Sequence, residues 1–162
     1  MGTAAEFERE LMRKKEETVQ KFVQLHRSIA LDAFRMIAAD TLQTGFQYGS
    51  PIWSGRYRSN HNISVGNPDF TIKPPNPETV GPGATRWPDQ PETVLNAQPV
   101  AQAAVVLNAL KPFDVAYITN PLPYARRIET GWSQLAPEGV YEVTAQAVQA
   151  KYQNVTLEGI QS

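Results

Sequence analysis

One long uninterrupted helical stretch at the start of the chain limits what this sequence can fold into. From Ala4 to Thr44 there is neither glycine nor proline, and apolar residues such as Phe22 and Ile29 recur at helical spacing, until Gly45 supplies a stop. At 1.5 Å per residue such a helix is roughly 60 Å long. A compact domain of this size has a diameter nearer ~35 Å. We therefore expect a helix that extends beyond its own domain.

The first turns of this helix are almost entirely charged. In EFERELMRKKEE, Glu10 and Lys14 have the i,i+4 spacing that supports a helix, and Phe7 and Leu11 are the main apolar residues. Two interpretations stay open. The segment is either a set of solvated first turns, or an arm that packs on a neighbouring subunit.

The stretch from Asn67 to Glu92 carries seven prolines in 26 residues. Proline lacks the N–H that a central strand needs, so this stretch predicts an extended surface loop. The apolar Trp87 within it favours docking on another surface. The other predicted elements are a strand at 60–65 with which Phe70–Ile72 could pair, a helix at 92–110 with an early turn or a break at Pro99, a strand at 113–119, a short helix at 124–130 and a final helix at 139–155.

These elements predict an α+β fold in a single domain, residues 1–162. It comprises the long N-terminal helix (4–44), a small, mainly antiparallel sheet flanked by helices, the proline-rich surface loop (67–92) and a C-terminal tail (156–162). Apolar residues make up 41% of the 162 residues and the net charge is −1, which disfavours binding nucleic acid through the whole surface. The chain has no cysteine, which excludes disulfides and cysteine-based zinc sites. No apolar run approaches the ~20 residues of a membrane span, so no membrane association is predicted.

No group of residues predicts catalysis, a metal or a cofactor. His26 lies on the apolar stripe of the first helix, and His61 has no acidic residue or second histidine at ligand spacing. Ser54 lacks the first glycine of a nucleophile elbow, and Glu129 and Glu138 are not singled out as a catalytic pair. We expect no catalytic residue and no metal ligand, and interpret the chain as a non-enzyme.

Basic and aromatic residues alternate in Arg56-Tyr57-Arg58, as they do in proteins that bind single strands. Arg126 and Arg127 form a second basic pair. Acidic residues lie near each cluster, whereas phosphate binding calls for many cations on one face. Contact with DNA in passing is therefore favoured over dedicated binding.

Two segments, SPIWSGRYRSNHNISVG and YITNPLPYARRIETGWSQLAPEGVYEVTAQAV, together resemble the tail-completion, or head–tail joining, proteins of tailed bacteriophages. SPIWSGRYRSNHNISVG resembles the family's T-P-V-D-T-G-R-L-R-S-S loop, although Ile52-Trp53-Ser54 replaces Val-Asp-Thr. YITNPLPYARRIETGWSQLAPEGVYEVTAQAV resembles a second signature, N-x-x-P-Y-A-x-x-x-E-x-G, which is followed by a Pro-led C-terminal helix. The candidate subunit-interface or fold-bracing residues are Trp53, Gly55, Arg56, Arg58, Trp87, Tyr124, Arg126, Arg127 and Glu129.

The resemblance implies a structural virion protein of the neck, which forms a homo-oligomeric ring of six copies between the capsid connector and the tail tube. Its partners would be its own copies, the tail tube protein and the connector or head-closure protein, with genomic DNA only passing through the channel. It implies no cofactor, and a location in the virion neck or tail after assembly in the host cytoplasm. A tail terminator ring that caps the tube, and a DNA-binding packaging accessory protein, stay open as alternatives.

Overall fold

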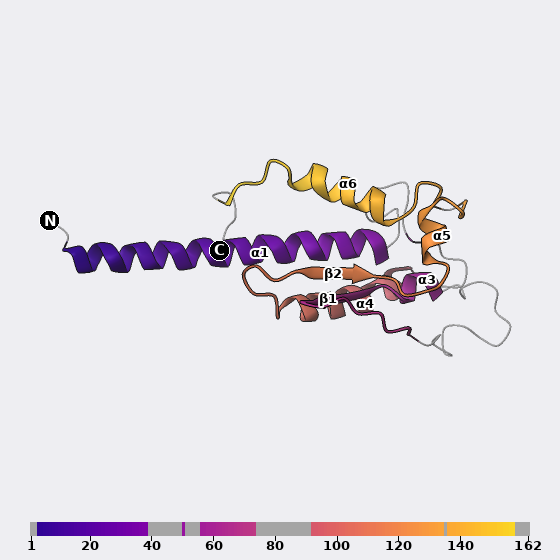
Figure 1. Ribbon diagram of the computed structural model, residues 1–162, viewed down its shortest axis with the longest axis horizontal. Helices are drawn as coiled ribbons and strands as arrows, with labels where there is room; N and C mark the ends of the chain where they lie inside the picture. Colours follow the sequence, from indigo (N-terminus) through magenta and orange to yellow (C-terminus); the bar gives the residue numbers. More distant parts are fainter. Residues whose placement is uncertain (1–2, 39–49, 51–55, 74–91, 135, 158–162) are drawn as a thin grey trace.

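The computed structural model describes residues 3–38, 50, 56–73, 92–134 and 136–157, with the side chains of 92–99 excluded. Trp53, Gly55 and Trp87 lie outside the described residues, so their predicted roles stay predictions. The described elements are α1 (Ala4–Ala38), α3 (Arg56–Ser59), β1 (Asn62–Val65), α4 (Glu92–Leu107), β2 (Ala116–Thr119), α5 (Ala125–Glu129) and α6 (Tyr141–Tyr152). A long helix, a small antiparallel sheet and flanking helices confirm the predicted α+β class (Figure 1).

The sheet pairs β1 with β2, antiparallel, with Ile63 opposite Ile118. The prediction that Phe70–Ile72 would pair with the first strand is wrong, because that segment is not a strand of this sheet. The physical reason is burial. Ile63 and Ile118 both pack against a cluster that contains Phe34, whereas Phe70 and Ile72 stay exposed.

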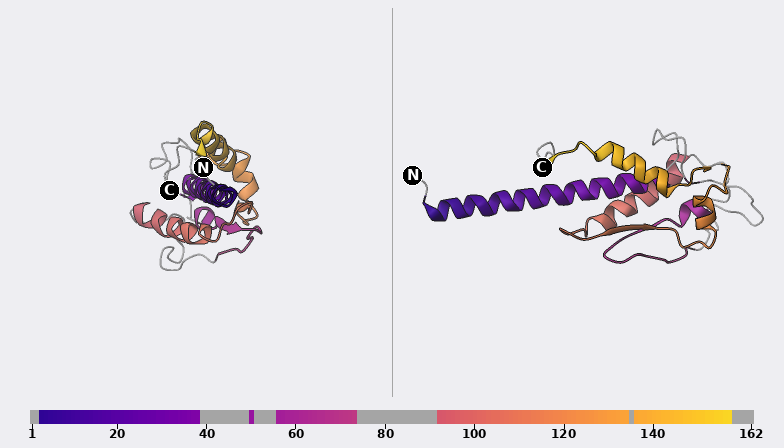
Figure 2. Two further views of the ribbon diagram at one scale, coloured as in Figure 1. Left: turned by 90° about the vertical axis from the view of Figure 1, so that its left-hand side faces the viewer. Right: turned by 45° about the horizontal axis from the view of Figure 1, so that its top comes forward.

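The C-terminal half of α1 is the centre of the core. It lies between α6 on one side and α4 with the sheet on the other (Figures 1 and 2). Val23 and Ala30 pack with Leu107 and Leu110 of the α4 side. Further along α1, Ile37 joins a cluster formed by Tyr57, Leu122, Ile128, Ala136 and Val140.

The N-terminal half of α1 extends past the rest of the chain. Every described residue from 3 to 18 is exposed, and Figure 1 shows this part of the helix with no other labelled element beside it. The helix spans 35 residues, or roughly 50 Å. The predicted end at Thr44 lies outside the described residues.

The helix α4 runs through Pro99 without a break, so Pro99 marks neither an early turn nor a boundary between two pieces. Proline fixes a φ close to the helical value, but inside a helix it removes one backbone hydrogen bond and crowds the preceding turn, at a cost of about 3 kcal/mol. The helix ends at Leu107, short of the predicted Leu110, and Leu110 N–H then closes a turn on the Leu107 carbonyl.

Candidate functional site

In the second family-like signature, the residues that contact one another lie at the corner between α5 and α6. The chain leaves α5 at Glu129 and begins α6 at Tyr141. The carboxylate of Glu129 accepts hydrogen bonds from the backbone N–H groups of Val140, Tyr141 and Glu142, at 2.9–3.0 Å. The N–H groups of a first helical turn have no partner within the helix, and a negative charge there is favoured by the helix dipole. Glu129 therefore fixes the start of α6 onto the end of α5.

Two glycines allow this corner to be tight. Gly131 and Gly139 have φ of +84° and +81°, a region that residues with a side chain rarely adopt. A Cβ at Gly139 would lie 2.6 Å from the Glu129 carbonyl oxygen, and one at Gly131 would lie 2.4 Å from the Pro137 carbonyl oxygen. Both positions thus require glycine for backbone angle and for space.

The other predicted residues of this signature divide between core and surface. Tyr124 packs against the buried cluster that contains Ile128. Arg126 is exposed, and the Glu129 carboxylate faces the start of α6 instead of Arg126. Arg127 lies over the ring of Trp132, 5.8 Å from its centroid.

Within the first signature, the described residues Arg56–Ser59 form a helical turn, α3. Arg56 is exposed and Arg58 is buried, so the two side chains face different ways. The Arg58 guanidinium donates a hydrogen bond to the Ser50 carbonyl, 3.0 Å away. Tyr57 is buried as well, so the basic–aromatic alternation is not a surface on which bases could stack.

A buried histidine that the sequence left without partners connects four parts of the chain. His61 Nε2 lies 2.7 Å from Ser50 Oγ, and Nδ1 lies 2.9 Å from the hydroxyl of Tyr141. Asn120 Nδ2 lies 3.4 Å from the same Nδ1. The ring also meets Tyr57 edge-on, with 4.9 Å between centroids.

The partners determine which nitrogen of His61 carries the proton. Ser50 Oγ is in hydrogen-bond contact with the Ile37 carbonyl, which can only accept, so the single hydroxyl proton of Ser50 points at Ile37. His61 Nε2–H must then donate to Ser50 Oγ, and Nδ1 accepts from Tyr141. Burial, and next the nearby charges of Lys73 and Arg58, lower the pKa of His61 to about 3. The neutral ring is therefore the form that fits.

This arrangement has the wrong polarity for a serine nucleophile. A general base would accept the serine proton, but here the imidazole donates to Ser50. The group on Nδ1 is the Tyr141 hydroxyl rather than a carboxylate. The network instead ties α1, β1 and α6 together. Sequence reasoning missed it because its members are far apart in the chain and share no spacing.

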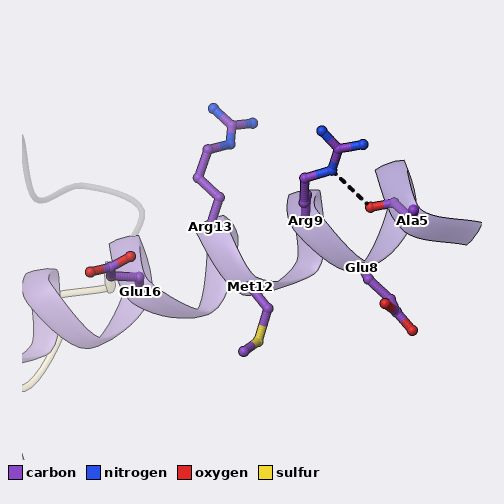
Figure 3. Close-up of a pocket in the computed structure, with 6 residues that line it drawn as sticks. All are labelled: Ala5, Glu8, Arg9, Met12, Arg13 and Glu16. Carbon is purple, nitrogen blue, oxygen red and sulfur yellow. Dashed lines mark hydrogen bonds between the residues drawn. The ribbon is translucent and has the colours of Figure 1, made fainter.

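The exposed half of α1 is the second candidate surface. Phe7 and Leu11 are 67% and 56% exposed, and Met12 is exposed beside them. Two of the cations nearby have partners in the same helix, since Arg13 pairs with Glu17 and Lys14 with Glu10. Figure 3 shows a shallow hollow along one face of this helix, with Arg9 and Arg13 on one side and Met12 on the other.

The described residues contain no group of three or more His, Asp or Glu side chains placed to hold a metal ion. Among the helices that the structure describes, none is both long enough and apolar enough to cross a bilayer. Comparison of the chain with protein-family models, with curated proteins and with solved structures gives no match.

Proposed function

We propose that this chain is a structural protein of the neck of a tailed bacteriophage. In this proposal it completes the tail or joins it to the head, as a ring of identical copies around the DNA channel. The same ring placed on the end of the tail tube would be a tail terminator, and that role is retained as the alternative within this class.

The observation that carries the proposal is the exposed N-terminal half of α1. A helix buries its apolar face against another element, and the described residues cover only the C-terminal half of α1. Phe7, Leu11 and Met12 are therefore exposed apolar residues that a neighbouring chain could cover. In a ring, each copy presents one surface to the next copy and a different surface to the previous one. An arm that leaves its own domain supplies one of these two surfaces.

The corner between α5 and α6 supports the family resemblance on physical grounds. The E-x-G part of the signature corresponds to Glu129 and Gly131, and both are required by the geometry of the corner. Glu129 and Gly131 of the second signature thus belong to one structural unit, the corner between α5 and α6.

A dedicated DNA-binding protein is the alternative from another class, and the arrangement of cations weighs against it. Arg58 is buried, and Arg13 and Lys14 are paired with acidic residues. Affinity for duplex DNA that falls steeply with salt would favour this alternative, whereas a ring through which DNA passes would show little such affinity.

The proposal is tested by native mass spectrometry of the purified chain, alone and with the tail tube protein of its own phage. We expect a complex that contains several copies of the chain together with the tube protein. A chain that shows no complex with the tube protein and no ring would contradict the proposal.

A further inference from the structure

The segment that follows β1, residues 69–73, crosses one face of the sheet and is held there by side chains. Asn62 Nδ2 donates to the carbonyl oxygens of Asp69 and Thr71, at 3.2 and 2.8 Å. Thr119, the partner of Asn62 on β2, also donates its hydroxyl proton to the Asp69 carbonyl. Asn62 and Thr119 thus anchor the segment from the sheet.

The end of the segment is anchored in the same way. Lys73 N–H donates to Asn60 Oδ1 at 2.7 Å, and its ammonium donates to the His61 carbonyl at 2.8 Å. Within the segment itself, Thr71 N–H donates to the carboxylate of Asp69 at 2.9 Å. The backbone groups of the segment that take part in these hydrogen bonds all belong to residues 69, 71 and 73. This period of two is that of an extended chain with one edge against the protein.

The opposite edge belongs to Phe70 and Ile72. Within the described part of the chain, their backbone N–H and C=O groups make no hydrogen bond, and their side chains are 66% and 49% exposed. An extended edge with free backbone groups and apolar side chains is a template for another strand.

The sequence of the segment, Asp-Phe-Thr-Ile-Lys, indicates which strand fits. We propose that residues 69–73 pair antiparallel with the same residues of a second copy, about a two-fold axis at Thr71. Asp69 then lies opposite Lys73 of the second copy, Phe70 opposite Ile72, and Thr71 opposite Thr71. Opposite charges, an aromatic next to a β-branched residue, and paired threonines are each favourable across strands.

The register also agrees with the hydrogen bonds. Phe70 and Ile72 carry the free backbone groups, and in this pairing they face each other as hydrogen-bonded pairs, while Thr71 faces Thr71 at the close, non-hydrogen-bonded position. When two copies of the segment run antiparallel, the acidic residue of one lies opposite the basic residue of the other. This charge complementarity is the reason to propose a second copy as the partner. A closed ring has no two-fold axis between neighbouring copies, so this dimer goes beyond the proposed function and does not rest on it.

Charge exchange between copies gives the sharpest test. Asp69→Lys would place two lysines opposite two lysines in a homodimer, and Lys73→Asp would place two acids opposite two acids. Mixed together, these two variants restore both opposite-charge pairs between copies, which no contact within one chain can do. Thermal unfolding of each variant shows that it is folded before the association is measured.

Sedimentation equilibrium distinguishes the outcomes. We expect the wild-type chain to form a reversible dimer as its concentration is raised, each variant to be largely monomeric at the same concentration, and the equimolar mixture to dimerise again. A wild-type chain that stays monomeric, or a mixture that associates no better than its components, overturns the proposal. The same outcomes would leave a ring formed with the tube protein untouched.

A cross-link tests the register separately. The chain has no cysteine, so Thr71→Cys introduces a single thiol at the two-fold axis. Non-hydrogen-bonded antiparallel positions have Cα atoms about 4.5 Å apart, within the range that a disulfide spans. Val105→Cys, at a position that is 70% exposed on α4, is the matched control. Under mild oxidation we expect rapid dimer formation for position 71 alone, and equal rates at the two positions would refute the pairing.

Discussion

Both carboxylate oxygens of Glu129 accept a hydrogen bond from the backbone N–H of Tyr141, each at 3.0 Å. One side chain at the end of α5 thereby caps a helix that begins several residues later. The same corner places the Tyr141 hydroxyl on His61, so capping and the buried network meet at one residue. Burial, and next the neighbouring Tyr57 and Glu129, raise the pKa of this hydroxyl, which keeps it protonated as a donor.

Removal of the cap should destabilise the fold. Glu129→Ala leaves the N–H groups of Val140, Tyr141 and Glu142 without their acceptor, and we expect the free energy of unfolding to fall by about 1–3 kcal/mol. Glu129→Gln keeps one acceptor oxygen and should lose less. Urea titration of the three proteins measures the order. An alanine variant as stable as the wild type would show that the cap contributes nothing.

Gly139 and Gly66 form a matched pair for testing how tight the corner is. Both have positive φ, but a Cβ at Gly66 would meet nothing within 4 Å, whereas one at Gly139 would meet Glu129. Gly66→Ala should therefore cost only the backbone strain, about 1–2 kcal/mol. Gly139→Ala should cost roughly 1–3 kcal/mol more, because the corner must open. Thermal or urea unfolding compares them, and equal losses would contradict the close approach.

The buried histidine should make stability depend on pH. Its pKa in the folded chain is lowered to about 3 from an ordinary 6.5, so the unfolded chain binds a proton first as the pH falls. The stabilisation is complete above pH 6.5 and is lost below it, at about 1.4 kcal/mol per pH unit. Unfolding free energies at pH 7, 5.5 and 4.5 measure this slope.

Two variants separate this effect from other titrations. His61→Gln removes the slope that arises from this group, with a loss of stability at pH 7 because the network is broken. His26→Gln, in the half-buried position on α1, should keep it. If the slope between pH 6.5 and 4.5 is the same in His61→Gln as in the wild type, the histidine is not its source.

The sequence predicted the elements that have strong local signals. The glycine- and proline-free run gave α1, and the β-rich run that ends at Thr119 gave β2. It failed where long-range burial decides between local options, as when Ile118, rather than Phe70–Ile72, became the partner of β1. It did not predict α3, because a single helical turn carries no periodicity.

The candidate site was predictable only in part. Glu129 and Tyr124 were identified through the family-like signature. The capping of α6 by Glu129 could not be predicted, because it depends on the geometry of the turn between the two helices, which residue spacing does not determine. The role of His61 was missed, because its partners Ser50 and Tyr141 come from distant parts of the chain. The self-complementary charge pattern of segment 69–73 can be read from the sequence. Which of its backbone groups are available for pairing follows only from the structure, which shows the side chains that bind the other edge.

The exposed arm should matter for assembly and not for folding. Phe7→Ser together with Leu11→Ser changes side chains that are largely exposed, so the free energy of unfolding should shift by less than about 0.5 kcal/mol per substitution. Incorporation into the ring should be lost, as measured by native mass spectrometry with the tube protein. Val105→Ser, at another exposed apolar position, is the control that should still assemble. Normal assembly by the double variant would rule out the arm as an interface.

Hydrogen–deuterium exchange over residues 4–18 tests most directly whether this half of α1 is covered by another chain in the assembled particle. In the free chain the residues of this segment are exposed, and we expect their amides to exchange rapidly. On assembly with the tail tube protein they should become protected, while the buried half of α1 changes little. Exchange over 4–18 that stays as fast in the complex as in the free chain would contradict the account.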